Sequence, residues 1–154
     1  MDAASAPMTT VAHPFAVLRL DHVVLRVRDL SASEAFYRAA LGCVVVRRRD
    51  DLGLVHLRAG ASMIDLVSVT GVLGRQGGAA PGSEGRNVDH VCLRVEPFDV
   101  AAIDAHLATI GVPSCGRAQA NFGAEGVGPA LYLTDPDGNT IELKGPVGDG
   151  TGGT

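Results

Sequence analysis

The sequence predicts an α+β fold of two tandem βαβββ modules, whose curled mixed sheets surround a cleft with the helices outside. The heptapeptide DHVVLRV at residues 21–27 returns as DHVCLRV at residues 89–95. Each copy alternates side chains with the period of a strand and is followed by a stretch with the period of a helix. The tripeptide IDL at 64–66 closes the first half as IEL at 141–143 closes the second. The chain is therefore expected to consist of two copies of one module that arose by internal duplication.

Length, charge and composition exclude several classes of function. A chain of 154 residues fits one domain, or two half-domains that share a core. Its net charge of −4 offers no basic surface to a nucleic acid. The 3 cysteines include no CxxC pair, no apolar run approaches the roughly 18 residues that cross a bilayer, and the first residues lack the order of a signal peptide. We therefore expect a cytoplasmic protein with free thiols that binds neither nucleic acid nor membrane.

The first module is expected to begin with a strand over residues 20–28, in which an apolar face alternates with a mixed face. A helix follows, opened by a capping box of Ser31 and Glu34 and ended by Gly42. Short alternating runs bounded by turn residues then predict three further strands, at residues 43–49, 53–59 and 61–69.

The second module repeats this order after a glycine-rich linker over residues 70–87, which has no periodic element and resembles a flexible flap. The twin strand occupies residues 88–95, and a helix runs from Asp99 to Ile110, where Gly111 ends it. Three more strands are expected at residues 114–118, 129–134 and 139–144, the last two joined by the turn DPDGN.

Composition sets the boundaries of the expected domain. Residues 1–17 are an irregular leader, and residues 147–154 are a glycine-rich tail with too little apolar surface to order itself. The domain spans residues 18–146, with modules over 18–69 and 88–146.

Four side chains on the strands suggest a metal site. His22 and His90 open the first strands of the modules, and Asp65 and Glu142 lie on the last strands. If the polar faces line one concavity, two imidazoles and two carboxylates form a ligand set for a divalent first-row metal. A single strand histidine is more often a packing or surface residue, but its symmetric repetition favours the metal. Asp65 has the shorter side chain, so orienting a histidine or a water is its alternative role.

Three segments resemble a known family: LDHVVLRVRDLSASEAFYRAALG, VDHVCLRV and GPALYLTDPDGNTIELKGP. They are similar to the vicinal oxygen chelate superfamily, which includes glyoxalase I, fosfomycin resistance transferases, ring-cleaving dioxygenases and bleomycin-binding proteins. The resemblance covers about residues 18–146. It implies a homodimer with one divalent metal ion per site (Ni, Zn, Co, Mn or Fe), with His22, His90 and Glu142 on the ligand positions. Asp65 falls where glyoxalase I enzymes commonly have glutamate.

The resemblance also implies roles in substrate binding and catalysis. Arg26 and Arg86 stand where glyoxalases carry arginines that bind substrate, although Arg26 has a repeat equivalent in Arg94 and could be inherited scaffold. A carboxylate beside the metal can move a proton between neighbouring carbons, so Glu142 is the expected base, with Asp65 as its partner. We expect a lyase or isomerase of the glyoxalase I type that acts on a small molecule, such as a glutathione or other thiol adduct.

Other members of the family leave alternatives open. An Fe(II) dioxygenase or a thiol transferase would use His22, His90 and Glu142 without Asp65. A binding protein of the bleomycin-resistance kind would need no metal, and retention of the three ligands argues against it. The site could lie within one chain or be shared between two. His56 and His106 are assigned ordinary packing or surface roles.

Overall fold

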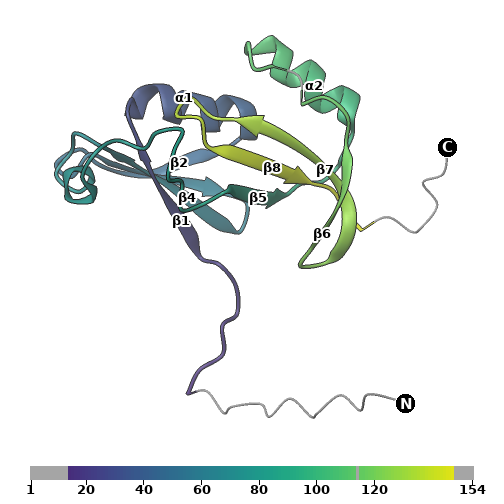
Figure 1. The fold of residues 1–154 in the computed structure, drawn as a ribbon, viewed down its shortest axis with the longest axis horizontal. Coiled ribbons are helices and arrows are strands. Elements are labelled where there is room, and N and C mark those ends of the chain that lie inside the picture. Colours follow the sequence, from purple (N-terminus) through teal and green to yellow (C-terminus); the bar gives the residue numbers. More distant parts are fainter. Residues whose placement is uncertain (1–13, 114, 148–154) are drawn as a thin grey trace.

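The computed structural model describes residues 14–113 and 115–147 and contains two four-stranded mixed sheets (Figure 1). The strand order is β1-β4-β3-β2 in the first sheet and β5-β8-β7-β6 in the second. In each sheet the first and last strands of the module run parallel, and the other pairs are antiparallel. Both sheets are open. The predicted α+β fold of two tandem βαβββ modules is confirmed.

The first module follows the expected order, with one correction at the start of its helix. The capping residue of α1 is Asp29, whose carboxylate accepts a hydrogen bond of 2.9 Å from the Ala32 N–H. The predicted capping box is therefore wrong, because Glu34 bonds instead to Arg48 on a neighbouring strand. The elements are β1 (His22–Val27), α1 (Leu30–Leu41), β2 (Val44–Arg49), β3 (Leu54–Ala59) and β4 (Ser62–Ser68).

The second module differs from the expectation in its third-last strand. Residue 114 lies outside the described residues, and the strand predicted over 114–118 is wrong at 115–118: β6 spans Gln119–Gly123 and turns within two residues into a longer β7. The linker also carries a short 3₁₀ helix, η1 (Gly74–Gly77). The elements are β5 (His90–Arg94), α2 (Val100–Thr109), β6, β7 (Gly126–Thr134) and β8 (Thr140–Lys144). Within the described residues no helix is long and apolar enough to span a membrane.

The predicted leader and tail fall mostly outside the described residues, which exclude 1–13, 114 and 148–154. Residues 14–21 lie within them and extend away from the body of the protein (Figure 1). Their large apolar side chains are exposed, and Leu20 retains 86% of its accessible surface.

One apolar core joins the two modules. Its strand residues come from a single face of each sheet, and both helices contribute to it. Since successive side chains of a strand point to opposite faces, the polar side chains between them lie on the far face of each sheet. The fully buried members are Val27, Tyr37, Val55, Leu57, Ile64, Leu66, Leu107 and Ile141.

The DPDGN turn fastens the second module to the first. Asp135 is 4% exposed and accepts a hydrogen bond of 2.8 Å from the Tyr37 hydroxyl of α1. Two residues later, Asp137 accepts from the Arg28 backbone N–H at 3.0 Å. The turn that the sequence predicts as a simple hairpin connection is thus part of the contact between modules.

Replacing Tyr37 with phenylalanine is expected to lower the free energy of unfolding by about 1–2 kcal/mol. The ring still fills its buried position, but the Asp135 carboxylate loses a hydrogen-bond donor between modules. Urea denaturation measures the change. Asp51→Asn, which removes an exposed pair with Arg49, is the control and should change stability by less than about 0.5 kcal/mol.

Candidate metal centre

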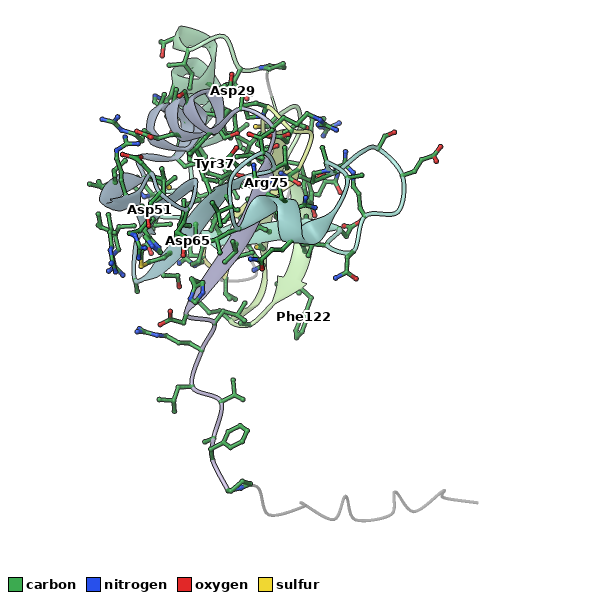
Figure 2. All side chains as sticks on the ribbon, turned by 90° about the vertical axis from the view of Figure 1, so that its left-hand side faces the viewer. Asp29, Tyr37, Asp51, Asp65, Arg75 and Phe122 are labelled. Atoms are coloured by element: carbon green, nitrogen blue, oxygen red, sulfur yellow. The ribbon has the colours of Figure 1, made fainter. Side chains whose placement is uncertain are left out.

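The first half of the predicted centre lies on the polar face of the first sheet. Asp65 on β4 is the register partner of Val24 on β1, so His22, two residues earlier, shares its face. His56 on β3 lies opposite Asp65, and its Nδ1 is 2.8 Å from Asp65 Oδ2. The other oxygen, Oδ1, is buried without a hydrogen-bond partner among the described residues. Asp65, labelled within the first sheet in Figure 2, therefore presents one unsatisfied acceptor.

The second half lies on the polar face of the second sheet. Glu142 is 5% exposed, and its Oε2 lies 2.9 Å from His90 Nε2. Its other oxygen, Oε1, accepts a hydrogen bond of 3.0 Å from the Asn121 side chain, which also contacts the Tyr132 hydroxyl. Cys92, an exposed residue, is the register partner of Glu142, and partial desolvation of its thiol together with the Glu142 charge raises the thiol pKa to about 11. The glutamate is thus held on both oxygens beside a protonated thiol.

An aspartate orients each predicted histidine ligand. Asp21 lies 2.8 Å from His22 Nδ1, and Asp89 lies 2.7 Å from His90 Nδ1. These hydrogen bonds are the main cause that raises the pKa of both imidazoles, and the Asp65 and Glu142 charges add to it. A carboxylate on Nδ1 fixes the ring and leaves Nε2 for a metal. The sequence carried this signal, because the repeated motif includes the aspartate before each histidine.

Asp89→Asn is expected to weaken metal binding about 10- to 100-fold, the usual effect of losing a carboxylate behind a histidine ligand. The neutral amide accepts the hydrogen bond from His90 Nδ1–H without the negative charge of the carboxylate. The imidazole is then less basic and binds a metal more weakly through Nε2. Competition against a chromogenic chelator measures the affinity. Asp50→Asn, an exposed charge change on the β2–β3 turn, is the control; equal losses in both variants would contradict the role of Asp89.

The two halves do not converge within one chain. Among residues 14–113 and 115–147, no three His, Cys, Asp or Glu side chains form a group that could hold a metal. Each sheet turns its apolar face to the shared core, so each polar face points away from it. His90 contacts Glu142 directly, whereas His22 only shares a sheet face with Asp65, whose contact is with His56. The two halves stay apart.

Arg26 and Arg86 line one cavity of about 540 Å³ between β1 and the linker. The Arg86 guanidinium donates to the backbone carbonyl of Gly138. The Arg26 guanidinium donates to linker carbonyls at 2.7 to 3.2 Å, those of Gly74, Gly77, Gly78 and Ala79. In this structure Arg26 fastens the linker, and its role in binding substrate stays a prediction.

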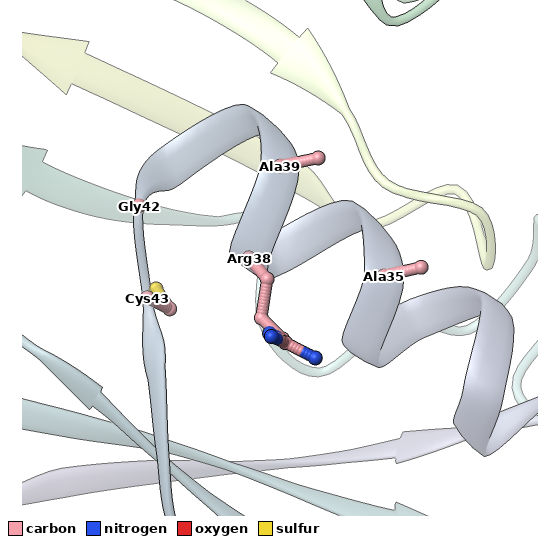
Figure 3. Close-up of a pocket in the computed structure, with 5 residues that line it drawn as sticks. All are labelled: Ala35, Arg38, Ala39, Gly42 and Cys43. Atoms are coloured by element: carbon pink, nitrogen blue, oxygen red, sulfur yellow. The ribbon is translucent and has the colours of Figure 1, made fainter.

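Two further hollows differ in their chemistry. A cavity of about 290 Å³ opens at the second half of the centre, where His90, Cys92, Glu142 and Lys144 line it. A more open one of about 440 Å³ lies beside the end of α1 (Figure 3), lined by Ala35, Arg38, Ala39, Gly42 and Cys43. It has neither histidine nor carboxylate, and burial raises the pKa of Cys43 to about 11. Only the first of these two has the groups that catalysis needs.

The residues of both halves fit a divalent metal. Each half has one imidazole and one carboxylate, which are donors that first-row divalent ions accept. The buried Asp65 Oδ1 has no partner within the described chain, and a cation would satisfy it. His90 Nε2 and Glu142 Oε2 already face one another across 2.9 Å. Brought together, the two halves would supply four donors.

Comparison with models of known protein families shows to which family the chain belongs. Residues 19–143 match the model of the Glyoxalase/Bleomycin resistance protein/Dioxygenase superfamily. The chain belongs to this superfamily. It is the vicinal oxygen chelate superfamily that the three sequence segments resemble, and its members commonly bind a divalent metal.

Individual similar proteins align with nearly the whole domain. The ethylmalonyl-CoA/methylmalonyl-CoA epimerase of Cereibacter sphaeroides is 29% identical over 132 residues, which cover 82% of this chain and 96% of the epimerase. A lactoylglutathione lyase structure from Agrobacterium tumefaciens has a TM-score of 0.59 at 20% identity, covering 84% of this chain and 94% of its own.

A third relative was solved with a metal. A mutant of the fosfomycin resistance protein FosX from Listeria monocytogenes, complexed with Mn(II) and 1S,2S-dihydroxypropylphosphonic acid, has a TM-score of 0.62 at 16% identity. The match covers 86% of this chain and 93% of FosX. At such identities, the two solved structures establish the shared fold.

Proposed function

We propose that the protein is a divalent-metal-dependent lyase or isomerase of the glyoxalase I type, which moves a proton at carbons next to a carbonyl. The observation that carries the proposal is the setting of Glu142. This buried carboxylate faces His90 Nε2 at 2.9 Å, is oriented by Asn121, and lines a cavity. Such a group can be both a metal ligand and a proton acceptor.

The complete centre would form between two copies of the chain. The His22–Asp65 pair of one copy would face the His90–Glu142 pair of the other, and the twofold axis would generate two equivalent sites. Leu20, Val24 and Val88 are exposed apolar side chains beside these pairs. Exposed apolar surface of this kind is typical of a protein interface. A homodimer would therefore complete the ligand set and cover this surface.

The metal would be held by His22, Asp65, His90 and Glu142. When bound, a divalent ion would polarise the substrate carbonyl and lower the energy of the negative charge that develops on its oxygen. The identity of the ion is left among Ni, Zn, Co, Mn and Fe, because imidazole and carboxylate donors suit all of them.

Proton transfer is assigned to the carboxylates. Glu142 would take the proton from the carbon next to the carbonyl and return it to the neighbouring carbon, while Asn121 keeps Oε1 in place. Asp65 is held by His56 through Oδ2, and its buried Oδ1, which has no hydrogen-bond partner among the described residues, is the oxygen that would meet a cation or the opposite side of the substrate. The substrate would be a small molecule with two adjacent oxygens, such as the thiol adduct of an α-oxoaldehyde.

The proposal is tested by reconstituting the protein separately with Ni, Co, Zn and Mn and assaying methylglyoxal with glutathione. Formation of the thioester is followed by its ultraviolet absorbance. Activity in at least one metal form, abolished by chelator and restored by that metal, is expected. No rate above background in any form would refute the glyoxalase reaction.

The curated relative favours a second candidate with the same proton chemistry. The epimerase at 29% identity is named for ethylmalonyl-CoA and methylmalonyl-CoA. In an epimerisation Glu142 and Asp65 would act on opposite sides of one carbon, each able to remove or return its proton. Incubating methylmalonyl-CoA with metal-loaded protein in heavy water would test this. If the protein is an epimerase, deuterium is expected at the carbon next to the thioester. A glyoxalase that does not epimerise methylmalonyl-CoA would introduce none.

A further inference from the structure

We propose that Lys144 binds a carboxylate of the substrate, so that the substrate carries a carboxylate group beyond the oxygens that reach the metal. This inference rests on the proposed function and specifies its substrate class. Lys144 is the only lysine in the sequence and lies on β8, two residues after Glu142. Because side chains two apart on a strand share a face, Lys144 and Glu142 line the same cavity.

The β6–β7 hairpin accommodates and fixes the Lys144 side chain. This side chain is only 6% exposed, and Nζ donates a hydrogen bond of 2.9 Å to the Gly126 carbonyl. Two glycines leave room for it: a Cβ at Gly123 would lie 3.0 Å from Lys144 Cε, and one at Gly128 would lie 3.0 Å from Nζ. The β6–β7 hairpin therefore wraps the lysine stem and leaves its ammonium at the cavity.

Lys144 forms no direct ion pair with any residue that the structure describes. Within the described residues no carboxylate oxygen lies within 4.0 Å of its ammonium, whereas the neighbouring Arg94 pairs with Glu125 at 2.9 Å and Glu96 at 3.1 Å. Glu142 is engaged by His90. A nearly buried cation without an anionic partner is costly, and an anionic ligand would offset the cost. Of the charges lining this cavity, Lys144 is the one left for a ligand.

The position and size of the charge indicate the ligand. Two residues along a strand correspond to roughly 6–7 Å, so the anion would lie about that far from the oxygens bound near Glu142. The cavity of about 290 Å³ also has Glu125 and Glu142 in its wall. Together with the cations Arg94 and Lys144, these carboxylates leave the lining without excess positive charge, which suits a singly charged carboxylate better than a doubly charged phosphate. We therefore expect a small acyl compound with a terminal carboxylate.

Two probes with the same chelating head separate this inference from the proposed function. The first probe, 2-oxobutyrate, offers two adjacent oxygens to the metal, one from its keto group and one from its carboxylate. The second probe, 2-oxoglutarate, has the same head and a distal carboxylate. Calorimetric titration of the Ni(II)-loaded protein is expected to give about tenfold tighter binding of 2-oxoglutarate, the usual worth of a hydrogen bond to a charged group. In Lys144→Gln, which retains a donor for Gly126 O, the two affinities should agree within about twofold.

Controls assign every outcome. Arg94→Gln removes a cation of the same cavity that is already paired, and it should retain the preference for 2-oxoglutarate. Lys144→Met is the second variant if Lys144→Gln is unstable, and unchanged 2-oxobutyrate binding verifies that either variant is folded. Equal binding of both probes by the unaltered protein, or a preference that survives loss of Lys144, would overturn the inference and leave the proposed function standing. Failure of both probes to bind would reject both.

Discussion

Two inactive variants are expected to restore activity when they assemble with each other. The first carries His22→Ala and Asp65→Ala, and the second carries His90→Ala and Glu142→Ala. In a composite site, a heterodimer of the two contains one centre with all four ligands intact and one with none. It should therefore have about half of the activity of the unaltered dimer, although each homodimer has almost none.

The reason lies in the separation of the two pairs within one chain. His90 and Glu142 are 2.9 Å apart, yet no third ligand of the kind joins them within the described part of the chain. Co-expression with two different affinity tags gives the heterodimer for assay with methylglyoxal and glutathione. The first variant carrying both tags is the control and should stay inactive. An inactive heterodimer would show that each chain builds its own site.

Glu142→Gln is expected to lower kcat/KM by a factor of about 10² to 10⁴, the usual contribution of a general base. The amide has nearly the same shape and can still accept a hydrogen bond from Asn121, but it cannot take a proton from carbon. The loss should appear mainly in kcat, measured with metal content determined in the same samples. Full activity in this variant would exclude Glu142 as the base.

Glu96→Gln is the matched control for this substitution. Glu96 follows β5, is exposed, and pairs with Arg94 outside the His90–Glu142 pair. It should retain activity within about twofold, since an exposed ion pair contributes little. A similar loss in both variants would indicate a general effect of charge.

The strands β4 and β8 could be predicted from their buried faces, and β6 could not. β4 and β8 bury Ile64 and Ile141, so their alternation is visible in the sequence. β6 lies at the edge of its sheet, and its Phe122, which projects from the hairpin in Figure 2, is 84% exposed. The sequence of β6, QANFG, has one large apolar side chain and so no sustained apolar alternation, and none of its residues is buried. Its place depends on pairing with β7.

The partners of the candidate ligands divide in the same way. Asp21 and Asp89 precede the histidines that they orient, so the repeated motif already contains them. His56 and Asn121 reach Asp65 and Glu142 from other strands, and their contacts depend on the register of each sheet. A sequence pattern specifies which face a residue occupies, but it leaves open the neighbour that it meets there.

The duplicated βαβββ modules and the strand faces that carry His22, Asp65, His90 and Glu142 could be read from the amino-acid sequence, as could the imidazole and carboxylate groups that make these side chains candidate metal ligands. These follow from local periodicity and from the chemistry of single residues. That the two halves of the centre point away from the shared core and remain apart in one chain is seen only in the folded protein. That outcome depends on how two apolar sheet faces pack against each other, which is a contact between distant residues. For this reason Asp65 and Glu142 lie in separate halves of the predicted centre. We propose that a second copy of the chain brings the two halves together.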